Sequence, residues 1–318
     1  MQEQQDFSQF RTICDWNLDV ESVSESAIFP GPKRVKPEDL AFAQELAEAV
    51  KHGYKEKALG QRKTFGIRSN GIRYRVQPQE YPYFQLRTLH DQVMAMENLG
   101  IPKPYLDVLL SRELRNRGGL VLVGGPTGSG KTTTVSSTLV ARLKLFGGYA
   151  LTLEDVIEYE MNGWHGDRGL CRQVQIQSNY REEMRGALRA FPSNDRSMLL
   201  FGEICDDIAA GELLRTALDG HLVLTTMHGN SIVALLERLI AIAKREMDVA
   251  EARSLLAQSL RLVVHQIREH SVPQVTMLNL LGPDARGAVN TIGNHETRLE
   301  QLQQTIDTQQ TAFMASSL

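Results

Sequence analysis

The stretch at residues 120–134 has the residue types and spacing of a phosphate-binding loop. It reads LVLVGGPTGSGKTTT, and the interval from Gly125 to Gly130, Lys131 and Thr132 fits the pattern G-x-x-x-x-G-K-[ST]. The glycines of the loop allow backbone conformations that a Cβ would forbid, so consecutive N–H groups can turn toward one anion. A glycine-rich loop that binds nothing is the alternative. Because an apolar run precedes the loop and a helix-compatible run follows it, we predict a nucleotide site.

Two side chains of this loop have specific roles in that interpretation. Lys131 would reach the β- and γ-phosphates of a nucleotide, and the Thr132 hydroxyl would bind Mg²⁺. The helix that begins near Lys131 adds the positive end of its dipole at the same point. The predicted nucleotide-binding residues are Gly125, Pro126, Thr127, Gly128, Ser129, Gly130, Lys131, Thr132 and Thr133.

Acidic and histidine residues follow three further apolar runs. The runs at 149–153, 198–201 and 222–226 alternate with helical patterns, which predicts a parallel sheet with helices on both faces. Ligands of such sheets bind beyond the carboxyl ends of the strands. The residues at these ends are Glu154, Asp155 and Glu158 after the first run, Glu203 after the second and His228 after the third.

Glu203 and His228 are candidates for a hydrolysis step. Four apolar residues before an acid are typical of a Walker-B strand, so Glu203 can act as a general base or orient the attacking water. His228 can contact the γ-phosphate, whereas His221 precedes the same strand and belongs at its other end. Taken alone, each residue is more often structural than functional. Their convergence on one phosphate loop favours a function.

Arginine residues are dense in a predicted hairpin of the N-terminal region. Apolar residues alternate with polar ones around Asn70-Gly71, which favours a two-residue turn, and residues 83–89 predict a further strand. The arginines of this region are Arg62, Arg68, Arg73, Arg75 and Arg87. They form either a solvated basic face or arginine fingers that reach a nucleotide held by a neighbouring subunit.

Length and composition predict a two-domain globular protein of the cytosol. The 318 residues, of which 42% are hydrophobic and 23% charged, exceed one small core. A net charge of −3 argues against broad nucleic-acid binding. Cys14, Cys171 and Cys205 form no C-x-x-C pair, so neither a disulfide framework nor a zinc site is indicated. The first fifteen residues do not resemble a secretory signal, and no apolar run reaches about 18 residues.

The predicted domain boundary lies within residues 90–104, where Gly100, Pro102 and Pro104 make a stiff break. We expect an N-terminal α/β domain at 1–95, a linker at 96–104 and a second domain at 105–318. Helical spacing of apolar residues predicts helices from Glu38 to near Gly53, at 105–115, at 249–269 and around 299–306. Asp206 or Asp207 is expected to cap one further helix, and Asn230 or Ser231 another.

Together these motifs resemble the secretion and pilus ATPases of bacterial type II and type IV systems, which include the PilT-type pilus-retraction motors. The resemblance covers roughly residues 65–270. GPTGSGKTTT at 125–134 is similar to the family's Walker A loop, and LTLEDVIEYE at 151–160 to its aspartate box. ALRAFPSNDRSMLLFGEICDD at 187–207 is similar to the segment ending in its Walker-B Gly-Glu pair. DGHLVLTTMHGNSIVALLERL at 219–239 is similar to its histidine box.

The resemblance extends to the N-terminal strands. GIRYRVQ at 71–77 and LRTL at 86–89 are similar to strands whose arginines, in the family, approach the nucleotide across a subunit interface. It therefore implies a small sensor-like (PAS-like) α/β domain joined to a RecA-like P-loop ATPase domain. The implied cofactors are ATP and Mg²⁺, and the implied assembly is a homo-hexameric ring. That ring would work at the inner face of the cytoplasmic membrane through a platform protein, in pilus retraction or substrate transfer.

The site residues that follow from the pattern and the resemblance fall into two further sets. The catalytic residues are Glu203, Glu158, His228, Arg73, Arg75 and Arg87, and the metal-binding residues are Thr132, Glu154 and Asp155. The chain departs from the family at Val156, where proline is usual, and at Cys205, where arginine follows the Walker-B acid. The absence of a four-cysteine zinc module argues against the type II secretion and pilus-extension branch, which leaves retraction-type or conjugation-type motors.

Two other functions remain open from the sequence. A structural ring subunit that binds ATP and scarcely hydrolyses it is one, and Cys205 is the residue that would favour it. A nucleic-acid-translocating ATPase with the same core is the other, and the acidic balance of the chain argues against it.

Overall fold

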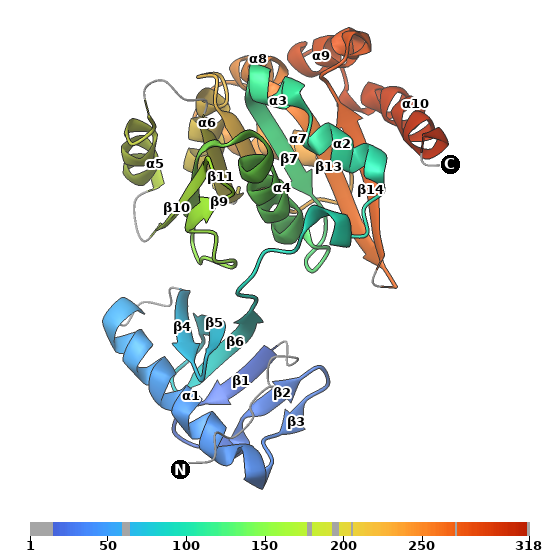
Figure 1. Ribbon diagram of the computed structural model, residues 1–318. Coiled ribbons are helices and arrows are strands. Elements are labelled where there is room, and N and C mark those ends of the chain that lie inside the picture. Colours follow the sequence, from blue (N-terminus) through green and yellow to red (C-terminus); the bar gives the residue numbers. More distant parts are fainter. Residues whose placement is uncertain are drawn as a thin grey trace. The chain divides into compact units, whose positions relative to one another are not determined.

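The computed structural model describes residues 15–58, 64–176, 180–192, 197–204, 206–270 and 272–316. These residues form two compact units (Figure 1). The smaller unit is the described part of Met1–Gln92 together with Asp155–Glu160, and the larger unit is the described part of Val93–Glu154 and Met161–Leu318. Cys14, Arg62 and Cys205, which the sequence analysis names, lie outside the described residues.

The smaller unit is built on a six-stranded sheet of order β3-β2-β1-β6-β5-β4, in which all neighbouring strands are antiparallel. Its strands are β1 (Asp15–Asp19), β2 (Ala27–Phe29), β3 (Lys33–Arg34), β4 (Phe65–Ser69), β5 (Ile72–Pro78) and β6 (Tyr83–Leu89). Helix α1 (Leu40–Gly53) buries Phe42 and Leu46 against Trp16, Leu18 and Phe84 of the sheet. The expected helix is thereby confirmed.

The expected hairpin is also confirmed, and its turn has the predicted chemistry. Asn70 and Gly71 have positive φ angles of 51° and 73°, as a two-residue turn with the twist of its flanking strands requires. In the hairpin Arg68 lies opposite Arg73, and Arg75 lies opposite Arg87 of β6. The arginine density of the sequence therefore becomes a cluster on adjacent strands.

The larger unit is built on an eight-stranded sheet of order β14-β13-β7-β12-β11-β8-β10-β9. Its strands are β7 (Gly119–Gly124), β8 (Gly148–Glu154), β9 (Gly163–His165), β10 (Gly169–Gln175), β11 (Met198–Glu203), β12 (Leu222–Met227), β13 (Leu260–Glu269) and β14 (Val272–Asn279). The strands from β13 to β10 are parallel, and the two edge strands β14 and β9 are antiparallel to their neighbours.

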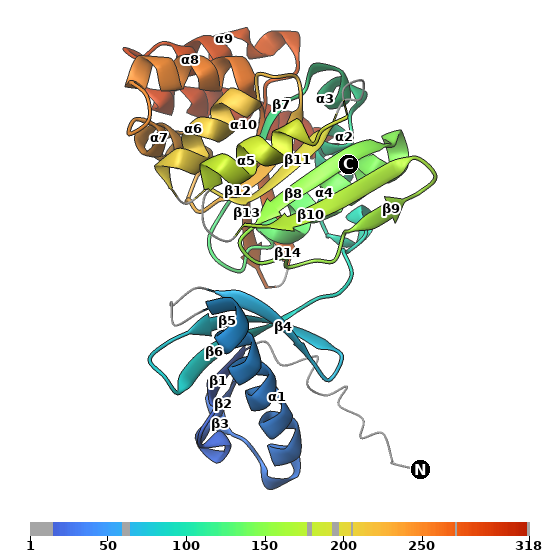
Figure 2. The same ribbon diagram turned by 90° about the vertical axis from the view of Figure 1, so that its left-hand side faces the viewer.

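Helices cover both faces of this sheet, as a parallel sheet requires. The helices of this unit are α2 (Lys103–Leu109), α3 (Arg112–Arg117), α4 (Lys131–Phe146), α5 (Tyr180–Arg189), α6 (Asp207–Thr216), α7 (Ile232–Ala243), α8 (Val249–Ser259), α9 (Arg286–Gly293) and α10 (Leu302–Ala315). Helix α4 lies on one face, and α6 and α7 lie on the other (Figures 1 and 2). Asp206 and Ser231 are the residues that cap α6 and α7.

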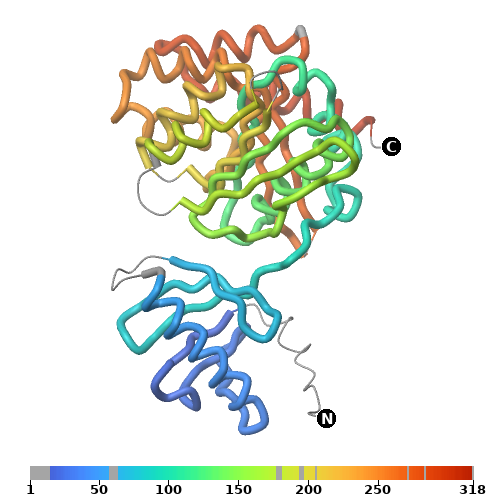
Figure 3. The backbone as a smooth tube through the Cα atoms, turned by 60° about the vertical axis from the view of Figure 1, so that its left-hand side comes forward, coloured from blue at the N-terminus to red at the C-terminus, as the bar shows by residue number. Residues whose placement is uncertain are grey.

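Two predicted helices differ from the structure. The prediction of one helix at 249–269 is wrong in its second half, because α8 ends at Ser259 and Leu260 begins strand β13. This strand lies beside β7, so a segment late in the chain packs against the strand of the phosphate loop (Figure 3). The predicted helix at 105–115 is broken into α2 and α3, because the Ser111 side chain accepts from the Leu114 backbone N–H and starts a second helix.

Candidate active site

The glycine-rich loop joins β7 to α4 with the backbone geometry of a phosphate cradle. Gly125, Gly128 and Gly130 have φ angles of 152°, 77° and 92°, in a region that L side chains rarely adopt. A Cβ on Gly125 would lie 2.0 Å from the Gln266 carbonyl oxygen, so the loop passes directly against β13. Helix α4 begins at Lys131, immediately after the loop. Backbone N–H groups and a helix N-terminus therefore meet at one point, which suits an anion.

Lys131 contacts both the loop backbone and a histidine ring. Its side chain is 8% exposed, and Nζ donates to the Pro126 carbonyl at 2.9 Å. Nζ also lies 3.3 Å from Nδ1 of His228, at the end of β12. The ammonium group is thus positioned between the loop backbone and an imidazole ring, within the reach of a phosphate that the loop would hold.

His228 connects Lys131 to Glu203. Its Nε2 atom lies 3.2 Å from Oε1 of Glu203, the last residue of β11. Strands β11 and β12 are parallel neighbours, and the Thr226 hydroxyl donates to the Gly202 carbonyl at 2.6 Å, which ties the two strand ends together. Ammonium, imidazole and carboxylate therefore form one connected row along the carboxyl edge of the sheet.

An arginine of α7 holds the loop after β12 in place. Nη1 of Arg238 donates to the His228 carbonyl at 3.0 Å, from the second turn of α7. This bond leaves the imidazole ring available to Lys131 and Glu203.

His221, at the other end of β12, has its ring centre 4.6 Å from that of Phe191. Burial lowers the pKa of His221, so its neutral form is favoured in the fold.

Glu154 ends β8 as a buried carboxylate with two neutral hydrogen-bond donors. It is 4% exposed, and its Oε1 atom accepts from the Thr152 hydroxyl at 2.6 Å and from Nε2 of Gln173 at 3.2 Å. Thr132 lies in the first turn of α4. Asp155, the third residue of the predicted metal set, is an exposed residue of the segment that belongs to the smaller unit.

These residues can be compared with what Mg²⁺ requires. The part of the chain that the structure describes contains no cluster of three or more His, Cys, Asp or Glu side chains that could hold a metal ion. Mg²⁺ at a phosphate loop is usually bound by the Ser or Thr hydroxyl of the loop and one acidic residue, together with phosphates and waters. The Thr132 hydroxyl beside the phosphate cradle fits that pattern and does not need a carboxylate cluster.

Within the smaller unit, Glu158 is bound by two of the three predicted arginine fingers. Nη1 of Arg75 lies 3.4 Å from Oε1 of Glu158, and Nη1 of Arg73 donates to the Glu158 carbonyl at 3.2 Å. Arg73 also donates to the Ile157 carbonyl, and its Nε atom lies 3.5 Å from Oε1 of Glu160. Residues 73 and 75 are two apart on β5, so both side chains lie on one face.

Arg87 has a different partner. Its Nε atom lies 3.2 Å from Oδ1 of Asp15, on the neighbouring strand β1. The structure thus brings Arg73 and Arg75 together with Glu158 and pairs Arg87 elsewhere in the same unit.

Gln266 of β13 is a site residue that the sequence analysis did not identify. Its amide nitrogen donates to the Ser129 carbonyl at 2.5 Å, and its amide oxygen accepts from the Thr134 hydroxyl at 2.8 Å. It is 4% exposed. One side chain therefore connects the end of the phosphate loop to the first turn of α4. Sequence reasoning missed it because the apolar residues before it, Leu260, Val263 and Val264, fit the helix predicted at 249–269.

Several known proteins are similar to this chain. A family model described as type II/IV secretion system protein matches residues 60–314. Among curated proteins, the chain is 36% identical over 175 residues to the type II secretion system protein HxcR of Pseudomonas aeruginosa, covering 54% of this chain and 35% of the relative. It is 32% identical over 189 residues to the type IV pilus assembly ATPase PilB of the same organism, covering 58% and 32%. The matches thus span about a third of these two relatives' length.

Solved structures show the same fold. The crystal structure of the pilus retraction motor PilT with bound ADP aligns with a TM-score of 0.68 and 24% identity, over 94% of this chain and 86% of that one. The ATPase DotB of Legionella pneumophila aligns with a TM-score of 0.65 and 19% identity, over 90% and 83%. The expected architecture, an N-terminal antiparallel-sheet domain and a larger parallel-rich α/β domain, is therefore confirmed.

Proposed function

Because the chain belongs to the type II/IV secretion system protein family, we propose that it is a Mg²⁺-dependent ATP hydrolase that drives a pilus or secretion machine. The observation that carries this proposal is the row Lys131–His228–Glu203 beside the glycine-rich loop. A loop that only stored a nucleotide would need the cradle and the lysine. A carboxylate at the end of the neighbouring strand, connected to the same lysine, adds the group that hydrolysis requires.

Each residue of the row has a separate task in the proposed reaction. Loop N–H groups and Lys131 bind the phosphates and stabilise the charge that develops on them. Glu203 accepts the proton of the attacking water, and His228 holds that carboxylate by a 3.2 Å contact. With Thr132 as its protein ligand, Mg²⁺ would neutralise phosphate charge. Glu154, which accepts two neutral hydrogen bonds, is proposed as a second oxygen near the ion.

The assembly and its partners are part of the same proposal. We propose a homo-hexameric ring at the inner face of the cytoplasmic membrane, working through a membrane platform protein and without nucleic acid. Relatives named for pilus assembly, pilus retraction and type II secretion support a machine of this kind. These relatives include proteins of type II secretion and pilus assembly, the branch that the absence of a four-cysteine zinc module argued against. The proposal therefore covers a pilus or secretion motor without a direction of motion. Each helix of the described residues is too short or too polar to span a lipid bilayer.

Steady-state phosphate release tests the enzymatic part of the proposal. Lys131→Ala should lose nucleotide binding, because its ammonium is the cation of the loop. Glu203→Gln should keep nucleotide binding and lower turnover by about 10²–10⁴-fold, the usual contribution of a general base. Glu237→Gln is the matched control, because this glutamate is an exposed residue of α7.

Two results would contradict this assignment. Wild-type turnover in Glu203→Gln would show that another group accepts the proton. ATP binding without phosphate release in the parent protein would instead indicate the ring subunit that binds ATP and scarcely hydrolyses it.

A further inference from the structure

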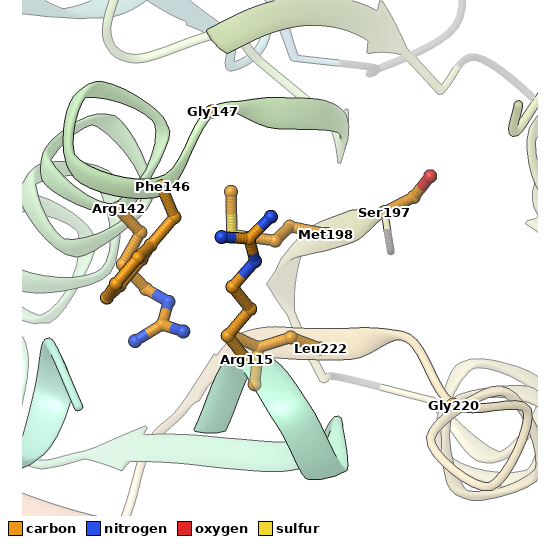
Figure 4. Close-up of a pocket in the computed structure, with 8 residues that line it drawn as sticks. All are labelled: Arg115, Arg142, Phe146, Gly147, Ser197, Met198, Gly220 and Leu222. Carbon is orange, nitrogen blue, oxygen red and sulfur yellow. The ribbon is translucent and has the colours of Figure 1, made fainter. Parts of the chain in front are cut away.

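A small cavity lies at the opposite edge of the larger unit's sheet, where β11 and β12 begin (Figure 4). Its lining includes Arg115 of α3, Arg142 and Phe146 of α4, Met198 of β11 and Leu222 of β12. Its volume is about 20 Å³, which is room for one water-sized particle. None of the described residues that line it is acidic. The cavity is remote from the row at the carboxyl edge, because Met198 and Leu222 are the first residues of strands that end there.

Arg142 forms the buried side of this cavity and has a donor without a partner. The residue is 1% exposed, and Nη1 donates to the carbonyls of Leu109 and Ser111 at 2.8 and 3.1 Å. Its Nε atom is buried and makes no hydrogen bond. A buried guanidinium whose bonds are made only to backbone carbonyls keeps its full charge, and an unused donor on it is costly.

Arg253 is a buried arginine whose guanidinium nitrogens are all bonded within the protein. Its Nε, Nη1 and Nη2 atoms donate to the carbonyls of Ile292, Thr297 and Thr291 at 2.7, 2.9 and 2.5 Å. Every nitrogen of that guanidinium therefore has an acceptor. Arg142 differs from Arg253 in leaving its Nε atom without a hydrogen-bond acceptor, as Arg181 and Arg261 also do.

A second guanidinium faces the same cavity. The central guanidinium carbons of Arg142 and Arg115 lie 5.1 and 5.6 Å from the centre of the Phe146 ring. Figure 4 shows both side chains directed into the space beside this ring, one from α4 and one from α3. Burial, and secondarily the charge of Arg115, lowers the pKa of Arg142 to about 10. Two cations that repel each other in a partly desolvated space attract an anion.

We propose that this cavity binds one monatomic anion of chloride size between Arg115 and Arg142. The anion would accept from the unused Nε atom of Arg142 and offset the repulsion between the two guanidinium groups. The volume of about 20 Å³ matches one small ion. Because Arg115 belongs to α3 and Arg142 to α4, the ion would join the two helices at the edge of the sheet remote from the nucleotide.

Bromide provides a direct test, because its anomalous scattering distinguishes it from water. Crystals of the full chain soaked in bromide should show an anomalous peak beside Nε of Arg142, and the peak should be absent from Arg115→Gln crystals. Arg115 is exposed, so this variant keeps the bonds of Arg142 to Leu109 and Ser111. A water without anomalous signal in the parent protein would overturn the proposal.

Thermal unfolding gives an independent measurement in solution. At a chloride concentration ten times its dissociation constant, linkage multiplies the folding equilibrium constant about elevenfold. For a domain of this size the melting temperature then rises by roughly 3–5 °C relative to gluconate at equal ionic strength. The Arg115→Gln variant should lose this chloride-specific rise, and Arg253→Lys should keep it. Equal melting temperatures of the parent in the two salts would contradict the proposal, whatever the ATPase assay shows.

Discussion

Lys131 connects the phosphate loop to the neighbouring strand end, because its Nζ atom contacts both the Pro126 carbonyl and Nδ1 of His228. A phosphate loop is a local pattern, so the eight residues from Gly125 to Thr132 suffice to predict its backbone and its lysine. The contacts of Lys131 with His228, and of His228 with Glu203, are not local, because they depend on which strands are neighbours. The sequence predicted that these residues share one edge of a sheet. The order of the strands then determines that the imidazole lies between the other two groups.

His265 provides a prediction about pH. This residue pairs with Gly124 across β13 and β7, and its Nε2 atom is buried without a hydrogen-bond partner. Burial lowers the pKa of its imidazole from 6.5, and a backbone hydrogen bond involving Gly229 only partly opposes this. The imidazole of His265 therefore binds a proton more readily in the unfolded chain than in the folded one. Its stabilising contribution is complete above about pH 6.5 and is lost as the pH falls through the lower folded pKa.

The measurement is the free energy of unfolding by denaturant between pH 7.5 and pH 5. We expect the parent protein to lose stability as the pH falls, and His265→Gln to lose less of it. Exposed His295→Gln is the matched control and should follow the parent curve. A His265→Gln curve parallel to that of the parent would show that this imidazole is not responsible.

At the scale of elements, β13 is the strand that sequence reasoning could not find. Leu255, Leu256, Leu260, Val263 and Val264 continue at helical spacing through the point where α8 ends. No glycine or proline separates the helix from the strand, and a short apolar run cannot be distinguished from a helix by its period alone. Pairing with β7 determines the conformation, which is a tertiary effect that no local pattern contains.

Gln266 makes this strand part of the proposed nucleotide site. Gln266→Ala leaves the Ser129 carbonyl and the Thr134 hydroxyl without their partner, so the phosphate loop loses a connection to α4. We expect the dissociation constant and the KM for ATP to rise about tenfold, with a smaller change in kcat. Binding of a fluorescent ATP analogue measures this directly.

A second glutamine serves as the control for that experiment. Gln258 of α8 is exposed and donates only to the neighbouring Ser254 hydroxyl among the contacts that the structure describes. Gln258→Ala should bind ATP as the parent does. If Gln266→Ala binds ATP equally well, the loop does not depend on β13 for its geometry.

At the scale of the whole molecule, the two predicted domains correspond to sheets of different kinds. Alternating strands and helices predicted the parallel sheet, and the Asn70-Gly71 hairpin predicted the antiparallel one. The sequence placed residues 154–158 together at one strand end. The structure separates them, because Glu154 stays in the larger unit and Asp155–Glu160 belongs to the smaller one. The boundary between the two units therefore falls inside the segment 151–160, where no change in amino-acid composition marks it.

Mixed rings test whether the arginines act on a neighbouring subunit. Arg75→Ala should lower ATP turnover by about 10³-fold, the lower range for an arginine finger. Mixing this variant with Glu203→Gln subunits, which carry intact arginines, should restore phosphate release. Arg34→Ala is the control, because Arg34 is an exposed residue of the same sheet that pairs with Glu25.

The mixing experiment separates two roles for Arg75. Rescue requires that one subunit supplies Glu203 and its neighbour supplies the arginine. Loss of turnover without any rescue would show that the pair with Glu158 serves the subunit's own smaller unit.

The position of β7 in the sheet has a consequence for the synthesis of the protein. Its two neighbours, β12 and β13, lie about 100 and 140 residues later in the chain. The ribosome therefore releases the phosphate loop long before the strands that flank it exist. A nascent chain that stops before residue 260 lacks one side of this strand and also lacks Gln266. Truncated products should consequently not compete with complete subunits for ATP, because the nucleotide site is among the last parts of the larger unit to form.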